Sequence, residues 1–245
     1  MITCVILSIK LNYYLVKLKV NDLELIKKLD KNLSKYRLFY HLLIENNKKF
    51  NLTAITEEKE VMIKHFVDSM CLSDIFEVGS SVVEVGSGAG FPSIPIKIER
   101  EDLDFTLIES NNKKCGFLQS LVDGLQLKTV TVVCNRAEVI GKDKNFRETF
   151  DYAVARAVAK INVLMEYCAP LLKVGGKMVF WNGESLDEEL SLSQNAMKIL
   201  NCKVDSVLPY DLGEYGKRYL VVIKKYQTTS SKYPRGLGKE KKSPL

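Results

Sequence analysis

The sequence predicts an α/β protein with a mainly parallel sheet. After residue 80, short apolar runs with the length of buried strands alternate with longer segments whose apolar residues recur at helical spacing. Alternating strands and helices are typical of a parallel sheet with helices on both faces. A glycine-rich loop directly follows the first of these strands. Ligands of such folds bind at the carboxyl ends of the strands, so we expect the functional site there.

The part of the chain before residue 80 is expected to be helical. Residues 22–50 carry apolar side chains at helical spacing, which predicts two helices with Asp22 as an N-cap. A third helix is expected over Lys59–Met70. Residues 1–20 are mixed in character and predict no particular element.

Seven strands and four further helices are expected after residue 80. The five buried strands are Ser81–Val85, Asp104–Ile108, Thr129–Cys134, Tyr152–Ala155 and Lys177–Trp181, and two further strand candidates are Lys203–Leu208 and Arg218–Lys224. The helices between them are Pro92–Ile98, Asn112–Leu125, Ile161–Leu172 and Leu186–Leu200. Residues 226–245, rich in Lys, Gly, Ser and Pro, predict a tail with little regular structure.

The composition is that of an ordinary globular protein. The chain has 245 residues, of which 46% are hydrophobic and 27% are charged. These values exclude a disordered chain and a small disulfide scaffold. No apolar run approaches the roughly 18–20 residues that a membrane span needs, and no signal peptide is recognisable, so we expect a cytoplasmic protein.

The net charge of +6 is unevenly distributed. Residues 1–50 contain ten basic and four acidic residues, and residues 224–245 contain seven basic residues and one acidic residue. The segment between them is therefore acidic overall. Basic ends suit a polyanionic partner such as nucleic acid, although Lys-rich ends that only interact with water remain the alternative.

Cysteine and histidine spacing does not predict a metal site. The six Cys are widely separated, with Cys115 and Cys134 the nearest pair, and the two His, His41 and His65, are also far apart in the sequence. Zinc motifs and dithiol motifs need much closer pairs. We therefore expect no metal, and we expect buried structural thiols rather than disulfides.

The glycine loop is the most informative segment. Gly86, Gly88 and Gly90 follow a strand, and Pro92 then opens a helix. The spacing differs from the dinucleotide motif, and the loop lacks the Gly-Lys-Ser/Thr end of a P-loop. Glu84, two residues before the first glycine, suits a cationic group better than a pyrophosphate. S-adenosylmethionine, which carries an ammonium and a sulfonium but no phosphate, fits this loop; a tight structural turn is the alternative.

The ends of the following strands support the same cofactor. Glu109 ends the second strand, where a carboxylate can accept hydrogen bonds from both ribose hydroxyls, although it could instead cap the next helix. Ala137 and Glu138 follow the third strand, where the adenine would lie. Arg156 ends the fourth strand beside the place of methyl transfer, although it could instead form a surface ion pair. Together the four strand ends predict a class I S-adenosylmethionine-dependent methyltransferase.

Several motifs then point to one family. The chain resembles the bacterial 16S ribosomal RNA guanine-N7 methyltransferase family, also called glucose-inhibited division protein B, over roughly residues 25–245. The matching stretches are Phe50–Ile55, Lys64–Ser69, Glu84–Pro95, Glu109–Lys114, Arg136–Glu138, Ala155–Ala159, Pro170–Leu172 and Tyr233–Arg235.

The resemblance implies a Rossmann-like methyltransferase fold with a helical N-terminal extension. We expect the extension over 1–75, the methyltransferase domain over 76–225 and a basic tail over 226–245. The resemblance also implies cofactor contacts at Gly86, Phe91, Ala137, Glu138 and Arg156; the glycine loop and the strand ends further predict contacts at Gly88, Gly90, Glu84 and Glu109. Two departures from the family pattern are Asn182, where a Lys is usual, and Glu240, where a Pro is expected.

The implied reaction is methyl transfer to N7 of a guanine in 16S ribosomal RNA or the small ribosomal subunit. Guanine N7 has a free lone pair, so no general base is expected. A small-molecule methyltransferase and a non-catalytic nucleotide-binding module are the alternatives. Candidates for shaping the active site are Arg156, His65 and Asp68, although a helix packed by Phe66 and Met70 with a satisfied His is the alternative. Phe91 and Trp181 could stack on the base, but core packing is the favoured interpretation for both.

The basic tail is expected to bind RNA. Deletion of residues 232–245 from this tail should weaken RNA binding and spare cofactor binding. We expect a monomer without a membrane partner. The candidate RNA-binding residues are Lys232, Arg235, Lys239, Lys241 and Lys242.

Overall fold

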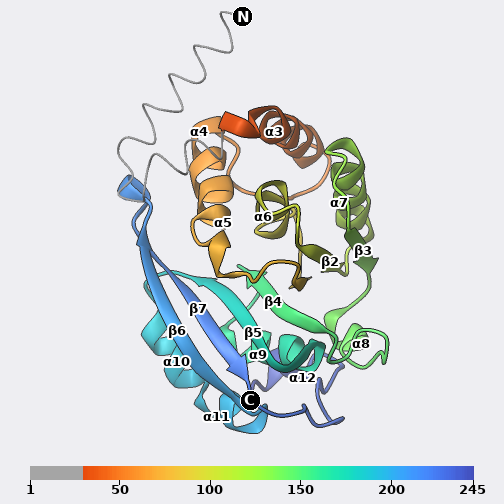
Figure 1. Ribbon diagram of the computed structural model, residues 1–245, viewed down its shortest axis with the longest axis vertical. Helices are drawn as coiled ribbons and strands as arrows, with labels where there is room; N and C mark the ends of the chain where they lie inside the picture. Colours follow the sequence, from red (N-terminus) through yellow and green to blue (C-terminus); the bar gives the residue numbers. More distant parts are fainter. Residues whose placement is uncertain (1–29) are drawn as a thin grey trace, which may run out of the picture.

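The computed structural model describes residues 30–245, and a seven-stranded sheet forms its centre (Figure 1). Asp22, Cys4 and the first predicted helix up to residue 29 lie outside the described residues. Within the described part of the chain, no helix is long and apolar enough to cross a membrane.

The strand order is β3-β2-β1-β4-β5-β7-β6. Neighbours from β3 to β5 are parallel, whereas β7 runs antiparallel to both β5 and β6. The predicted mainly parallel α/β sheet is therefore confirmed. The strands are β1 (Ser81–Val85), β2 (Asp104–Glu109), β3 (Val130–Cys134), β4 (Phe150–Arg156), β5 (Leu172–Asn182), β6 (Cys202–Asp211) and β7 (Lys217–Lys225).

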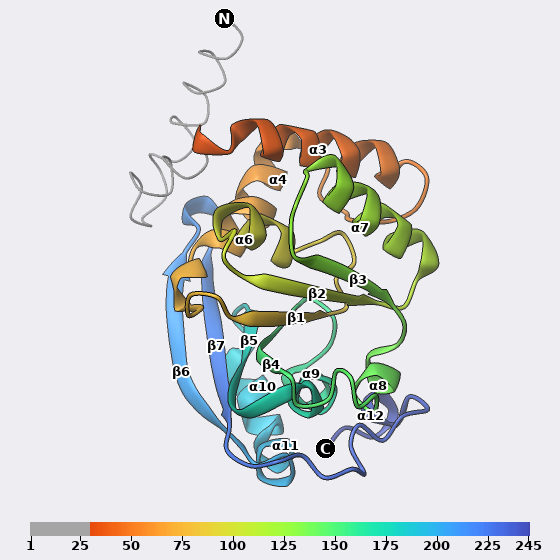
Figure 2. The same ribbon diagram turned by 45° about the vertical axis from the view of Figure 1, so that its right-hand side comes forward.

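Different helices cover the two faces of the sheet. Side chains of a strand alternate between faces, so Val82 packs in one core and Val83 in the other. Figures 1 and 2 show α3, α6 and α7 on one side and α9, α10 and α11 on the other. The bounds are α6 (Ser93–Glu99), α7 (Asn112–Gly124), α9 (Ile161–Cys168), α10 (Leu186–Leu192) and α11 (Gln194–Ile199).

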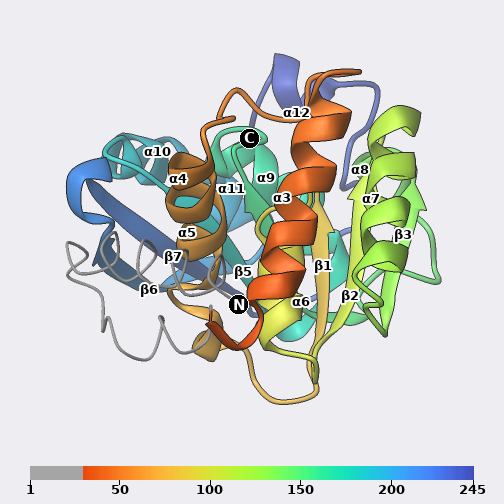
Figure 3. The ribbon, with the colours of Figure 1, turned by 90° about the horizontal axis from the view of Figure 1, so that it is seen from above.

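The helices before the sheet belong to the first of these cores. Figure 3 shows α3 (Leu33–Asn47) lying between α7 and the helical segment Glu58–Met70. In the core, Phe66 contacts the rings of Tyr36 and Phe39 with centroids 5.1 Å apart. The predicted helix over Lys59–Met70 is present, but its middle is a π-helix: it comprises α4 (Glu58–Val61), η1 (Met62–Val67) and α5 (Asp68–Met70).

Two predicted helices differ from the expectation: one ends early and the other is divided into two. The helix beginning at Ile161 stops at Cys168, because Pro170 lacks the N–H that a continuing helix needs, and β5 then begins at Leu172. The predicted helix over Leu186–Leu200 is split at Ser193, whose hydroxyl donates to the Glu189 carbonyl at 2.6 Å. The short helix α8 (Ala137–Ile140) was not predicted.

The C-terminal segment, residues 226–245, is folded against the sheet domain and is not a loose tail. Pro234 and Glu240 are buried, and a short helix, α12 (Lys239–Lys242), contacts α9. Just before this segment, the fully buried Lys225 donates to Glu148 at 2.7 Å. Part of the basic charge counted at this end of the sequence is therefore buried and neutralised.

Candidate cofactor and active site

The candidate site lies where the strand order reverses, between β1 and β4. Two adjoining cavities open there, at the carboxyl edge of the parallel strands. Cavity A lies beside the ends of β1, β2 and β3, and cavity B lies between the end of β4 and the helical segment Glu58–Met70. The two are halves of one cleft, because they share four lining residues: Gly86, Glu109, Ser110 and Val158.

The glycine loop lets the chain come close to this cleft. Gly86 has a φ of 74°, and a Cβ added there would lie 2.8 Å from a methyl of Val158. Gly90 has a φ of 88°, and its Cβ would meet Ile94 at 2.9 Å. Both positions therefore require glycine for conformation and for space. Gly86 and Gly88 line cavity B, whereas Gly90 packs against the helices behind it.

Glu109 is fixed at the border between the cavities. Its carboxylate accepts hydrogen bonds from the backbone amides of Gly88 at 2.9 Å, Ser110 at 2.8 Å and Asn111 at 2.9 Å. The side chain is 8% exposed. A carboxylate has about four acceptor sites, so three amides leave capacity for a hydroxyl group from the cleft. Helix capping, the alternative role, is performed by Asn111, which accepts from Lys113 and Lys114.

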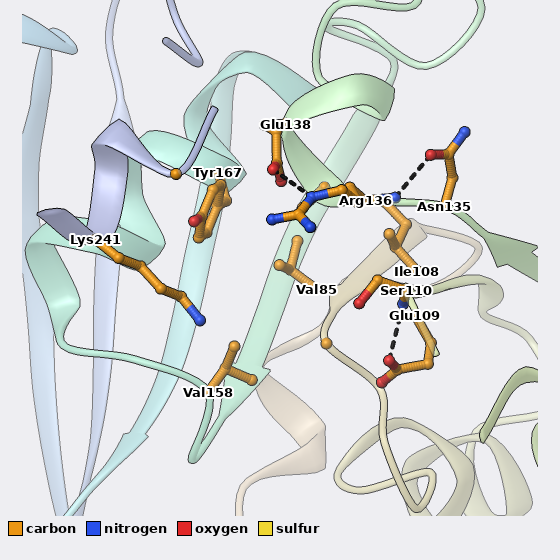
Figure 4. A pocket seen from close by; sticks show the side chains of 13 residues that line it. Val85, Ile108, Glu109, Ser110, Asn135, Arg136, Glu138, Val158, Tyr167 and Lys241 are labelled. Atoms are coloured by element: carbon orange, nitrogen blue, oxygen red, sulfur yellow. Dashed lines mark hydrogen bonds and ion pairs between the residues drawn. The ribbon is translucent and has the colours of Figure 1, made fainter. Parts of the chain in front are cut away.

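Cavity A is flanked by the residues that follow β3. Glu138, in the first turn of α8, accepts from Arg136 Nε at 2.6 Å. Ala137 lies beside it, and Tyr167 comes from α9 (Figure 4). The predicted pair of Ala137 and Glu138 thus shares one cavity with Gly86 and Glu109.

Phe91 lines cavity B but offers no free ring face. Its ring stacks on Phe39 with centroids 4.8 Å apart and on His65 with centroids 4.5 Å apart. This arrangement matches core packing, the favoured interpretation of Phe91, and leaves no ring face for a target base. Trp181 packs against the same core, and its indole N–H donates to the Asp68 carbonyl at 3.0 Å.

A polar network joins β4 to the helical segment. Arg156 Nη1 donates to Asp68 Oδ2 at 2.8 Å, and both side chains are largely buried, with 12% and 9% exposed. Tyr210, near the end of β6, donates to Asp68 Oδ1 at 2.6 Å. The Asp68 carboxylate is thus held on both oxygens and orients the guanidinium of Arg156 toward cavity B. The alternative for Arg156, a surface ion pair, does not match this burial.

His65 belongs to the same network and is neutral. Its Nδ1 lies 3.2 Å from Arg156 Nη2, and its Nε2 lies 2.8 Å from Thr53 Oγ1. Because Arg only donates, Nδ1 accepts and Nε2 carries the proton. Burial, followed by the charge of Arg156, lowers the pKa of His65 to about 3. Within the described residues, the three candidates His65, Asp68 and Arg156 therefore all line cavity B, and each is bonded to another of them.

Glu84 lies beneath the loop and lines neither cavity, which corrects its proposed contact with a cationic ligand group. It is 0% exposed, and neither carboxylate oxygen has a hydrogen-bond partner among the described residues. Burial raises the pKa of Glu84 to about 8. The side chain points into the core because β1 alternates its faces, and Glu84 shares a face with Val82.

One of the basic tail residues is not free to bind phosphate as predicted. Arg235 is bound to the buried Glu166, with Nη2 donating to Oε2 at 2.7 Å. Lys241 lines cavity A. Lys241 is exposed as well, as are the remaining candidates, Lys232, Lys239 and Lys242.

The expectation of free thiols is wrong for one pair. Cys115 and Cys134 form a disulfide between the first turns of α7 and the end of β3. Their wide separation in the sequence carried no signal, because only the parallel pairing of β2 and β3 brings them together. Cys71, Cys168 and Cys202 are free, and the last two are buried.

Sequence reasoning missed several residues of the cleft. Arg218 lines cavity B, and Tyr210 bonds to Asp68 behind it; both come from the hairpin of β6 and β7, whose turn lies at the carboxyl edge of the sheet. Neither belongs to a local motif. Lys64 and Lys114 also line cavity B; both lie within stretches that the family resemblance had marked.

Comparisons with known proteins identify the family. Residues 32–214 match the model of the family described as rRNA small subunit methyltransferase G. The chain is 44% identical over 214 residues to ribosomal RNA small subunit methyltransferase G of Carboxydothermus hydrogenoformans, covering 86% of this chain and 90% of that protein. It is 45% identical over 219 residues to the protein of the same name from Exiguobacterium sibiricum, covering 88% and 92%.

Solved structures share the fold at low identity. A SAM dependent methyltransferase from Aquifex aeolicus has a TM-score of 0.51 and 17% identity, covering 74% of this chain and 97% of that one. The M. jannaschii TYW2 structure in complex with AdoMet has a TM-score of 0.53 and 15% identity, covering 69% and 77%. The sequence matches over most of the chain establish the family: the chain belongs to the rRNA small subunit methyltransferase G family.

Proposed function

We propose that this chain transfers a methyl group from S-adenosylmethionine to N7 of a guanine in 16S ribosomal RNA. The observation that carries the proposal is the placement of Glu109, fixed by three amides at the border of two cavities. A nucleoside whose ribose binds Glu109 has its base in cavity A and its 5′ substituent in cavity B. Family membership supports ribosomal RNA as the substrate.

The residues of the cleft fit this cofactor. A Cβ at Gly86 would meet Val158, so the loop leaves room for a ligand only with glycine at this position. Glu109 retains acceptor capacity for ribose hydroxyls. The adenosine part would be held by Gly86, Gly88, Glu109, Ala137 and Glu138. The methionine part would be bordered by Phe91 and Arg156.

The chemistry needs positioning more than proton transfer. When bound, the cofactor supplies an electrophilic methyl group on a sulfonium. The N7 lone pair forms the new bond to the methyl carbon as the carbon–sulfur bond breaks, and the electron pair of that bond stays on sulfur. No proton moves, which agrees with a cavity B in which His65 is neutral and Asp68 is held by Arg156 and Tyr210. A well-oriented pair of reactants can gain about 7–11 kcal/mol from positioning alone.

The charged groups around cavity B suit RNA. Lys64, Lys114 and Arg218 line it, and Lys232, Lys239 and Lys242 are exposed on the C-terminal segment. Phosphates attract such residues, and the resulting binding weakens as salt rises. A small-molecule enzyme would not need them. Because one chain forms both cavities, we propose a monomer that acts on ribosomal RNA in the cytoplasm.

Transfer of labelled methyl groups tests the proposal. Small-subunit RNA from cells that lack this protein should accept label from S-adenosylmethionine, whereas the same RNA from cells that contain it should not. The rate should fall as salt rises. Label in small molecules but not in RNA would favour the small-molecule alternative, and cofactor binding without any transfer would favour the binding module.

A further inference from the structure

The C-terminal segment is anchored tightly beside cavity A. Arg147 donates to the carbonyls of Thr229 at 2.6 Å and Tyr233 at 2.9 Å. Arg235 donates from Nε and Nη2 to Glu166, a residue of α9 that is 0% exposed, and its backbone amide donates there as well at 2.9 Å. A buried charge with this many partners fixes the segment in one position.

This anchoring brings α12 to the wall of cavity A. Glu240 is fully buried and accepts from the Gly236 amide, which holds the turn before the helix. Gly238 and Lys241 consequently line the cavity opposite Glu109 and Ser110. Figure 4 shows the Lys241 side chain extending into the cavity between Tyr167 and Val158.

The ammonium group of Lys241 has unused hydrogen-bonding capacity. Among residues 30–245, no hydrogen bond or ion pair to its Nζ is found, whereas the nearby Glu138 is occupied by Arg136. Lys241 does not line cavity B, where the cationic sulfonium and ammonium groups of the cofactor would lie. The base would lie in cavity A, and an adenine ring offers nitrogen acceptors and no positive charge, so Lys241 can donate to it.

We propose that Lys241 is a cofactor-binding residue that donates a hydrogen bond to the adenine, and that residues 234–245 close the adenine end of the cleft. This inference rests on the assignment of cavity A to the adenosine part of the cofactor. It changes the expectation drawn from the sequence, in which removal of residues 232–245 spares cofactor binding. The same segment now connects the cofactor with exposed lysines available to RNA.

Calorimetric titration of the full chain with S-adenosylmethionine and S-adenosylhomocysteine, without RNA, tests the inference. Lys241→Met should weaken both ligands about tenfold and equally, because both share the adenine and a hydrogen bond from a charged donor is lost. Lys242→Met removes the same charge from the same helix outside the cavity and should bind both ligands as the unaltered chain does. If Lys241 acted only through its charge, Lys241→Met would instead bind the cationic S-adenosylmethionine more tightly than the unaltered chain does.

Two further variants separate the possible failures. Glu109→Gln tests the cavity assignment: if it binds both ligands normally, the assignment itself fails. If Glu109→Gln loses affinity while Lys241→Met does not, only the role of Lys241 is overturned. A chain ending at Gly236 keeps the bonds of Arg235 to Glu166 but lacks α12, and it should bind at least as weakly as Lys241→Met while melting cooperatively. Unchanged affinity in that chain would overturn the closing role of the segment.

Discussion

Arg156 and Asp68 form a largely buried ion pair, with Nη1 and Oδ2 2.8 Å apart, that joins the end of β4 to the helical segment before the sheet. The pair fixes the guanidinium beside His65 and Phe91. The N-terminal helices therefore complete one wall of the proposed active site.

Asp68→Asn should destabilise the protein strongly. Removing one partner leaves the Arg156 charge buried and unpaired, which typically costs about 3–5 kcal/mol in the free energy of unfolding. Urea denaturation measures this change. Glu45→Gln is the matched control, because it breaks an ion pair with Lys49 whose side chains are 65% and 61% exposed, and such pairs contribute less than about 1 kcal/mol. Equal losses in the two variants would show that the buried pair is not structural.

His65→Ala should slow methyl transfer at saturating cofactor. The imidazole stacks on Phe91 and accepts from Arg156, so its removal loosens both sides of cavity B. We expect a single-turnover rate reduced by about tenfold or more, since misplacement of reacting groups is costly. Cofactor affinity should fall less than the rate does, because the adenosine part would bind in cavity A, which His65 does not line. An unchanged rate would remove His65 from the active site.

Glu84→Gln should change how stability depends on pH. The pKa of Glu84 is raised to about 8 by burial, so the folded state keeps a proton that the unfolded state has lost above pH of about 4.5. The free energy of unfolding should therefore fall as pH rises across that interval, by about 1.4 kcal/mol per pH unit from this group. The variant has no such group, so its stability relative to the unaltered chain should increase from pH 5 to pH 8. Parallel curves for the two proteins would contradict a neutral Glu84.

The exposed lysines of the C-terminal segment should contribute to RNA binding. Changing three of them to Gln should lower the slope of log affinity against log salt by about two to three, as expected when three phosphate contacts are lost. Filter binding to small-subunit RNA at several salt concentrations measures the slope. A control with three exposed lysines changed far from the cleft should keep the original slope, and equal slopes in both variants would exclude the segment from the RNA interface. The test residues are Lys232, Lys239 and Lys242, and the control residues are Lys128, Lys198 and Lys203.

The sequence was sufficient to predict the sheet and the strand ends that border the candidate site. The bounds predicted for β1 agree with the structure, and Glu109 and Ala137 lie at strand ends as expected, because a buried strand followed by a turn is a local signal. Contacts between distant segments had no such signal. The disulfide of Cys115, the bond from Tyr210 to Asp68 and the fold of the C-terminal segment all depend on tertiary packing.

Net charge was the weakest guide to function. Counting charges located the basic C-terminal end correctly, but it could not identify the acidic residues that pair with these basic side chains. Lys225 and Arg235 are neutralised by Glu148 and Glu166, two acids that lie far away in the sequence. Only the folded chain separates the lysines that are free for RNA from those that hold the structure together.

The most direct test of the proposed reaction is to find the atom that receives the methyl group. RNA that this chain has methylated should be treated with borohydride and then aniline, which cleave a strand where guanine carries a methyl at N7. We expect one new cleavage site, at a guanine in 16S ribosomal RNA, whose intensity rises with the label incorporated. Incorporated label without strand cleavage would contradict transfer to N7 and the mechanism without a general base.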